Sequence, residues 1–85
     1  MKFRVLLIDD DETLCEVIQL GLERLGGFEV GFATDGKSGI LMAKKGNPDV
    51  ILLDVCMPKM NGIEVLKALK SQYPLSQIPV IMLSG

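Results

Sequence analysis

The sequence predicts a single α/β domain built on a parallel sheet, and three observations support this prediction. Short apolar segments typical of buried strands alternate with segments in which apolar residues recur at helical spacing. The 85 residues are enough for one small domain and no more. A composition of 48% hydrophobic and 24% charged residues is typical of a globular chain and not of a disordered one.

The first part of the chain predicts a strand, a helix and a second strand. Residues 3–8 (FRVLLI) form an apolar run, and Asp11 is the expected N-cap of the helix that follows. Gly26 and Gly27 end this helix. Its apolar residues recur at helical spacing: Leu14, Val17, Ile18, Leu22 and Leu25. Residues 28–33 (FEVGFA) alternate between apolar and other side chains, which predicts a half-buried strand at the edge of a sheet.

The second part predicts two more helices and two more strands. A short helix near 37–45 follows a turn, and residues 50–54 (VILLD) form a strand that is apolar on both faces. After a loop, a helix is expected near 62–72, followed by a fully apolar strand at 78–83 (IPVIML). The order βαβαβαβ favours a parallel sheet.

Composition excludes several classes of function. The net charge is −2 and no basic run is present, so direct binding to nucleic acid is not expected. No apolar segment is long enough for a signal peptide or a membrane span. Cys15 and Cys56 have no metal-binding or redox spacing, and we interpret them as free thiols in a reducing cytoplasm. The absence of histidine excludes Ser-His and Cys-His catalysis and zinc sites with histidine ligands.

Polar residues follow three of the predicted strands. Asp9, Asp10 and Asp11 come after the first strand, Asp54 ends the third, and Ser84 follows the fourth. Because the carboxyl ends of parallel strands share one edge, Asp9, Asp10 and Asp54 are expected to lie together. Clustered carboxylates that repel one another need a positive partner, and they suit Mg²⁺. The alternative is that one aspartate caps the helix and the others are solvated, and for Asp11 we favour capping.

A second motif suggests a different function. Residues 31–38 (GFATDGKS) match the phosphate-binding pattern G-x-x-x-x-G-K-[ST], which would make the chain a nucleotide-binding protein. Such a loop should follow a buried strand and open a helix, but its first glycine lies inside the predicted strand 28–33. This alternative is therefore the less favoured one.

Three segments resemble the receiver domain of two-component response regulators: VLLIDDDE, VILLDVCMPKMNG and IPVIMLSG. They occur in the family's order and spacing across the whole chain, so residues 1–85 are interpreted as a partial receiver domain. The resemblance implies a doubly wound, flavodoxin-like parallel sheet with strand order 2-1-3-4 in these residues. Right-handed crossovers then place the first helix on one face and the other two helices on the opposite face.

The resemblance also implies roles for individual residues. Asp54 would accept a phosphoryl group from a histidine kinase, and Asp10, Asp54 and the backbone carbonyl of Cys56 would bind Mg²⁺. Asp9 would assist the metal through a water molecule, and the Ser84 hydroxyl would bind phosphoryl oxygens. We expect a signalling domain and not an enzyme, beyond transfer of the phosphoryl group to its own Asp54. The rival interpretation is a degenerate receiver that acts only as an interaction module.

A complete receiver continues with a fifth strand, an invariant lysine at its end, and two further helices, none of which these 85 residues contain. We therefore expect weak phosphorylation, or none, of the 85 residues alone. Strand 78–83 would be an exposed apolar edge, and the face of the first helix would be only partly covered. If these residues are the whole polypeptide, we expect a homodimer or swapped oligomer through these surfaces. The alternative is that the missing segment exists in the molecule and covers them.

Overall fold

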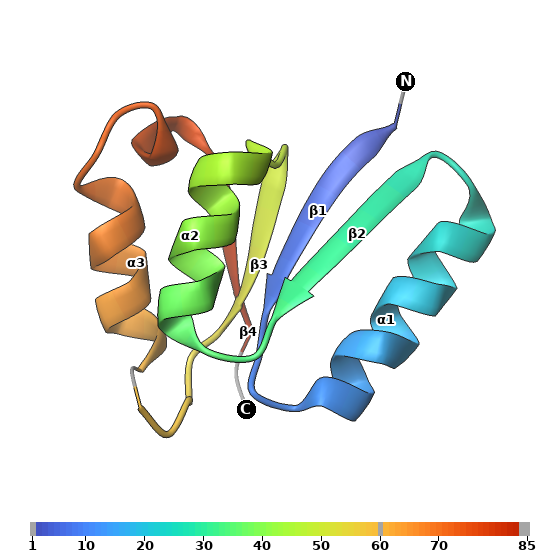
Figure 1. Ribbon diagram of the computed structural model, residues 1–85, viewed down its shortest axis with the longest axis horizontal. Coiled ribbons are helices and arrows are strands. Elements are labelled where there is room, and N and C mark those ends of the chain that lie inside the picture. The colour runs from blue at the N-terminus through green and yellow to red at the C-terminus, as the bar shows by residue number, and fades with distance from the viewer. Residues whose placement is uncertain (1, 60, 84–85) are drawn as a thin grey trace.

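The computed structural model describes residues 2–59 and 61–83, which form a single parallel sheet flanked by helices (Figure 1). The strands are β1 (Phe3–Ile8), β2 (Phe28–Ala33), β3 (Val50–Asp54) and β4 (Val80–Leu83). Their order is β2-β1-β3-β4, and every neighbouring pair is parallel. The predicted fold class and strand order are confirmed.

Three α-helices and one short 3₁₀-helix connect the strands: α1 (Glu12–Leu25), α2 (Gly36–Gly46), α3 (Gly62–Lys70) and η1 (Leu75–Gln77). Each α-helix begins after a residue whose side chain accepts a hydrogen bond from the backbone N–H three residues on. These pairs are Asp11 with Leu14, Asp35 with Ser38, and Asn61 with Glu64. Such caps satisfy backbone donors that have no partner within the helix, so the local sequence fixes where each helix starts.

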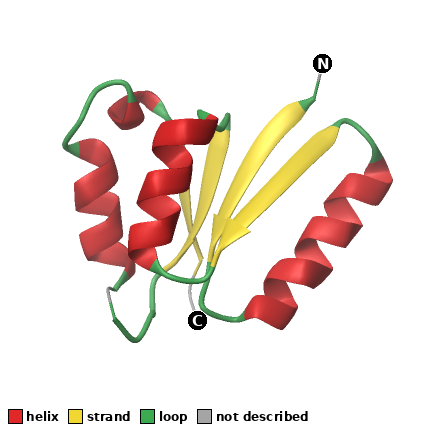
Figure 2. Ribbon diagram, in the orientation of Figure 1, coloured by secondary structure: helices red, strands yellow, loops and turns green. Residues whose placement is uncertain are grey.

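The helices lie on opposite sides of the sheet, with α2 and α3 next to each other and α1 on the far side (Figures 1 and 2). Alternation along the strands explains this, because Leu6 and Ile8 point toward α2 and α3 while Leu7 points toward α1. The main core lies under α2 and α3, and it contains Leu6, Ile8, Ala43, Ile51, Leu53, Met57, Val65, Leu69, Leu75 and Ile78. The predicted distribution of helices is confirmed.

Two element boundaries differ from the prediction. The third helix ends at Lys70 and not near residue 72, and β4 begins at Val80 and not at residue 78. Between them η1 forms a tight turn in which the N–H of Ile78 donates to the carbonyl of Leu75 (3.0 Å). Lys70 Nζ donates to the carbonyl of Ile78 (2.9 Å), so Ile78 is bound to the last residue of α3 before β4 begins.

The face that carries α1 is only partly covered. Helix α1 packs against β2 at one edge of the sheet, so within the described residues it does not extend over the same face of β4 at the other edge. Side chains here are well exposed: 61% for Val17, 76% for Leu25 and 52% for Ile81. No helix in the described ranges is long and apolar enough to cross a membrane.

Candidate metal and phosphoryl site

Three carboxylates meet at the carboxyl edge of the sheet. One side-chain oxygen from each of Asp9, Asp10 and Asp54 lies within 4.8 Å of the other two. Asp9 follows β1 and Asp54 ends β3, and these adjacent strands pair Ile8 with Leu53, so both aspartates reach the same level. Asp9 and Asp54 are buried whereas Asp10 is exposed. The structure thus brings together the three residues that the sequence predicted.

The two buried carboxylates are held in the same way. Asp9 Oδ1 accepts a hydrogen bond from the N–H of Asp11 (2.9 Å), and Asp54 Oδ1 accepts one from the N–H of Cys56 (3.2 Å). In both cases the donor is two residues further on, which is the geometry of an Asx turn. Among the described residues, no protein donor contacts Oδ2 of either aspartate, so each carboxylate keeps one oxygen for a ligand.

No cation of the described residues balances the charges of the cluster. Burial raises the pKa of Asp9 above its usual value, and the nearby charges of Asp54 and Asp10 raise it further, against the hydrogen bond from Asp11. Within the described part of the chain, no lysine or arginine forms an ion pair with the three carboxylates. A cation from solution is the natural partner for such a cluster.

The thiol of Cys15 lies beneath the cluster. Cys15 is fully buried, and its Sγ donates to the backbone carbonyl of Asp9 at 3.5 Å. Burial raises the pKa of this thiol to about 11, with a further contribution from the charge of Asp9. The thiol therefore stays neutral near pH 7 and adds no charge to the site.

The donor set fits Mg²⁺ and not a softer metal. Carboxylate and carbonyl oxygens are hard ligands, and Mg²⁺ is commonly held by one or two carboxylates together with water. No cysteine sulfur belongs to the cluster in the described residues. The free oxygens of Asp9 and Asp54 and the exposed carboxylate of Asp10 are the groups available to such an ion.

Glycine at position 62 lets α3 begin directly against the cluster. The N–H of Gly62 donates to the carbonyl of Val55 (2.7 Å). A Cβ atom at this position would collide with the carbonyl oxygen of Asp54 and would lie 2.6 Å from the Cα of Val55. The backbone from the Asp54 carbonyl to Val55 is therefore fixed by contact with the first residue of α3.

Other residues considered from the sequence lie elsewhere or contribute only backbone atoms. Cys56 is exposed, and its N–H, not its thiol, touches Asp54. Lys59 lies near Asp35, whose pKa is lowered mainly by hydrogen bonds from Ser38 and also by the charge of Lys59. Ser84 lies outside the described residues. The hydrogen bond from the Cys56 N–H was not predicted from the sequence, although aspartate side chains commonly accept from the backbone two residues on in turns.

The segment 31–38 does not form a phosphate-binding loop. Gly31 lies within β2, and only Thr34 and Asp35 separate this strand from α2. Asp35 accepts hydrogen bonds from both the N–H and the hydroxyl of Ser38 (2.8 and 3.0 Å). A carboxylate thus occupies the helix N-terminus where a phosphate would bind.

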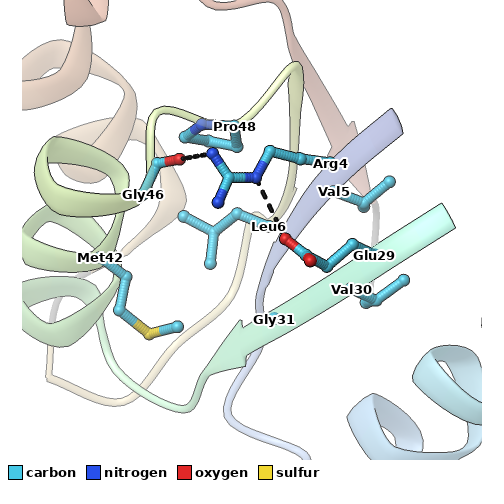
Figure 3. A pocket seen from close by; sticks show the side chains of 9 residues that line it. All are labelled: Arg4, Val5, Leu6, Glu29, Val30, Gly31, Met42, Gly46 and Pro48. Carbon is cyan, nitrogen blue, oxygen red and sulfur yellow. Dashed lines mark hydrogen bonds and ion pairs between the residues drawn. The ribbon is translucent and has the colours of Figure 1, made fainter. Parts of the chain in front are cut away.

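A cavity of about 190 Å³ lies at the opposite end of the sheet, between the β1–β2 pair and α2 (Figure 3). Arg4 crosses it, donating from Nε to Glu29 Oε1 (3.1 Å) and from Nη1 to the carbonyl of Gly46 (2.9 Å). Ligand pockets usually measure about 300–1,000 Å³. This smaller cavity, far from the acidic cluster, is interpreted as a packing feature around the Arg4 side chain.

Comparison with known proteins agrees with this geometry. The sequence profile described as "Response regulator receiver domain" matches residues 5–85. The chain is 39% identical over 85 residues to the alkaline phosphatase synthesis transcriptional regulatory protein PhoP of Bacillus subtilis. It is 37% identical over 82 residues to the DNA-binding dual master transcriptional regulator RpaA of a Synechocystis species. These matches cover 100% and 96% of this chain but only 34% of each relative.

Solved structures of response regulator proteins also match this chain. The chemotaxis protein CheY4 of Vibrio cholerae matches with a TM-score of 0.90 and 34% identity, over 96% of this chain and 68% of that one. The N-terminal domain of a response regulator receiver protein from Methanoculleus marisnigri matches with a TM-score of 0.88 and 33% identity, over 93% and 63%. The chain spans about a third of the length of the curated relatives and about two thirds of the solved domains.

Proposed function

The chain belongs to the response regulator receiver domain family, and from this premise we propose that Asp54 accepts a phosphoryl group from a sensor histidine kinase. The observation that carries the proposal is the position of Asp54, which ends β3 inside a cluster of three carboxylates. Its Oδ1 is held by the N–H of Cys56, and its Oδ2 is left without a protein donor among the described residues. The free oxygen is the one available to attack phosphorus.

The proposed step forms one bond and breaks one. An oxygen of the Asp54 carboxylate attacks the phosphorus of a phosphohistidine, and an acyl phosphate forms on Asp54. The bond between phosphorus and the imidazole nitrogen breaks, and its electron pair stays on that nitrogen, which then takes up a proton. The main contribution of the protein to this reaction is to position the Asp54 carboxylate. The hydrogen bond from Cys56 and the contact with Gly62 provide this positioning.

Asp10, Asp54 and the backbone carbonyl of Cys56 would hold Mg²⁺, and Asp9 would assist through a water molecule. When bound, Mg²⁺ supplies positive charge that offsets the carboxylates and the incoming phosphoryl oxygens. In our proposal the Ser84 hydroxyl also binds a phosphoryl oxygen. The protein would act in the cytoplasm as a phosphoacceptor and not as an enzyme on other substrates.

The proposal is tested with the protein as it is expressed from its own gene. Incubation with a small phosphoryl donor and Mg²⁺ should add one phosphoryl group, detected by intact-mass measurement. The Asp54→Asn variant should stay unmodified, whereas Asp11→Asn, which alters only the helix cap, should be modified as in the wild type. An unmodified wild-type protein would instead support a degenerate receiver that serves only as an interaction module.

Metal binding is tested separately by calorimetric titration with Mg²⁺. Asp10→Ala should weaken binding sharply because Asp10 is the exposed carboxylate of the cluster. Asp11→Ala should bind Mg²⁺ with wild-type affinity, since the Asp11 group that faces the cluster is its backbone N–H. Equal affinities of the wild type and Asp10→Ala would refute the metal assignment.

We also propose that this chain self-associates through β4 and the open face beside α1. The support is the exposure of Ile81 (52%) and of Val17 on α1 (61%). Ile81 is in register with Leu52 and Leu7, so its side chain lies on the face of the sheet that carries α1. Sedimentation at several protein concentrations should reveal a dimer that Ile81→Lys weakens. A wild-type monomer at all concentrations would contradict this proposal.

A further inference from the structure

The two outer strands of the described sheet, β2 and β4, differ in the hydrogen bonds that the backbone groups at their free edges make. The N–H of Phe3 donates to the carbonyl of Gly27 (2.8 Å), and the N–H of Asp9 donates to the carbonyl of Ala33 (3.1 Å). Because these groups alternate along a parallel ladder, the residues between them at even positions direct their N–H and C=O away from β1. Val30 is the central one, so both of its backbone groups face the outer edge of β2.

Two side chains of α1 form hydrogen bonds with the outward-facing N–H and C=O groups of Val30. Gln19 Nε2 donates to the carbonyl of Val30 at 2.7 Å, and the N–H of Val30 donates to Glu23 Oε2 at 3.2 Å. Gln19 and Glu23 are one turn apart on α1, so they lie on the same side of the helix. Together they offer one donor and one acceptor to a single residue, which is what a neighbouring strand would offer.

Among the described residues, Val30 differs in this contact from the other outward-facing residues of β2 and β4. Phe28 and Phe32 also point their backbone groups outward, but no side chain of the described chain hydrogen-bonds to them. On the other side of the sheet, Val80 and Met82 of β4 are equally free of such contacts in the described residues. An uncovered edge strand rich in aromatic and β-branched residues is a template for pairing with another chain.

We propose that Gln19 and Glu23 form a clamp on Val30 that closes the outer edge of β2, and that its release opens this edge to a second copy of the chain. The second copy is the natural occupant because β2 is self-complementary about Val30: in an antiparallel pair centred there, Phe28 of each strand lies opposite Phe32 of the other. The clamp is a self-blocking contact, since α1 satisfies the groups that the partner strand would use.

Hydrogen exchange of backbone amides tests the clamp itself. In the wild type, the amide of Val30 should exchange at least about tenfold more slowly than those of Phe28 and Phe32. Gln19→Glu keeps the side-chain size but removes the donor and places a second carboxylate beside Glu23, so it should speed exchange at Val30. Glu23→Gln is the matched control, because its amide oxygen can still accept from Val30 and the slow exchange should persist. Equal exchange at Phe28, Val30 and Phe32 in the wild type would overturn the clamp.

Self-association tests the consequence. Gln19→Ala/Glu23→Ala removes both contacts while keeping good helix formers in α1. This variant should associate more strongly than the wild type in sedimentation, and association should slow exchange at Phe28 and Phe32. Slowed exchange at Val80 and Met82 instead, or association no stronger than in the wild type, would overturn the proposal. If the double variant fails to fold, the two size-matched single variants still decide whether the clamp exists.

Discussion

Gly39 of α2 lies directly against Ile8 of β1, the residue that precedes Asp9. A Cβ atom on Gly39 would lie 2.5 Å from Ile8 Cδ1 and 2.8 Å from Ile8 Cγ1. Ile8 is fully buried, so the absence of a side chain at position 39 makes room for the larger residue on the strand. The helix thereby packs close to the sheet immediately below the acidic cluster.

This relationship predicts that the two positions are energetically coupled. Gly39→Ala gains about 1 kcal/mol in helix propensity but should lose about 1–3 kcal/mol through overpacking, so we expect net destabilisation. Ile8→Val removes the nearest atom, and Gly39→Ala should then cost less than it does in the wild type. Urea unfolding of the two single variants and the double variant measures this coupling, and strictly additive changes would contradict it.

Gly62→Ala should be more damaging than Gly39→Ala. The added methyl group would meet the backbone at Asp54 and Val55, which cannot rotate away as a side chain can. We expect a loss of at least about 2 kcal/mol in the free energy of unfolding and weaker Mg²⁺ binding, because the backbone at Asp54 must shift.

The control for Gly62 is Gly21→Ala in the middle of α1, where a Cβ would meet nothing within 4 Å. This change should stabilise the protein by about 0.5–1 kcal/mol, since alanine favours a helix interior. Denaturation in urea measures both variants. If both lower stability equally, crowding at Asp54 is not the cause.

The cap of α1 predicts a separation between stability and metal binding. Asp11→Ala removes the acceptor for the N–H of Leu14 and should cost about 0.5–2 kcal/mol of stability. Asp11→Asn should stay close to the wild type, because asparagine caps equally well. Thermal unfolding provides the measurement, and an equal loss in both variants would show that the charge matters more than the hydrogen bond.

The cap of α2 predicts a pH dependence. Hydrogen bonds from Ser38 lower the pKa of Asp35 below its ordinary value of 3.8. The contribution of Asp35 to stability is therefore fully present above pH 3.8 and is lost as pH falls through the lowered pKa. Asp35→Asn does not titrate, so the stability difference between wild type and variant should shrink in acid. Denaturation at a series of pH values tests this, and a difference independent of pH would contradict it.

The sequence could predict the features that follow from local patterns and chain topology. The strand order and the meeting of Asp9 with Asp54 follow from parallel strands with right-handed connections. The contacts of Gln19 and Glu23 with Val30 could not be predicted, because polar residues one turn apart are typical of any solvated helix face. The early start expected for β4 was wrong because the chain first forms η1, whose last turn the N–H of Ile78 closes by donating to the carbonyl of Leu75.

The matched turns at Asp9 and Asp54 have a consequence for how the site would bind a ligand. Side chains that are free to rotate lose conformational entropy when a ligand fixes them. Here Oδ1 of each buried carboxylate is already fixed by a backbone N–H two residues on, so both rotamers are set beforehand. A ligand at Oδ2 would therefore restrict little further side-chain rotation, because the main chain preorganises both buried carboxylates.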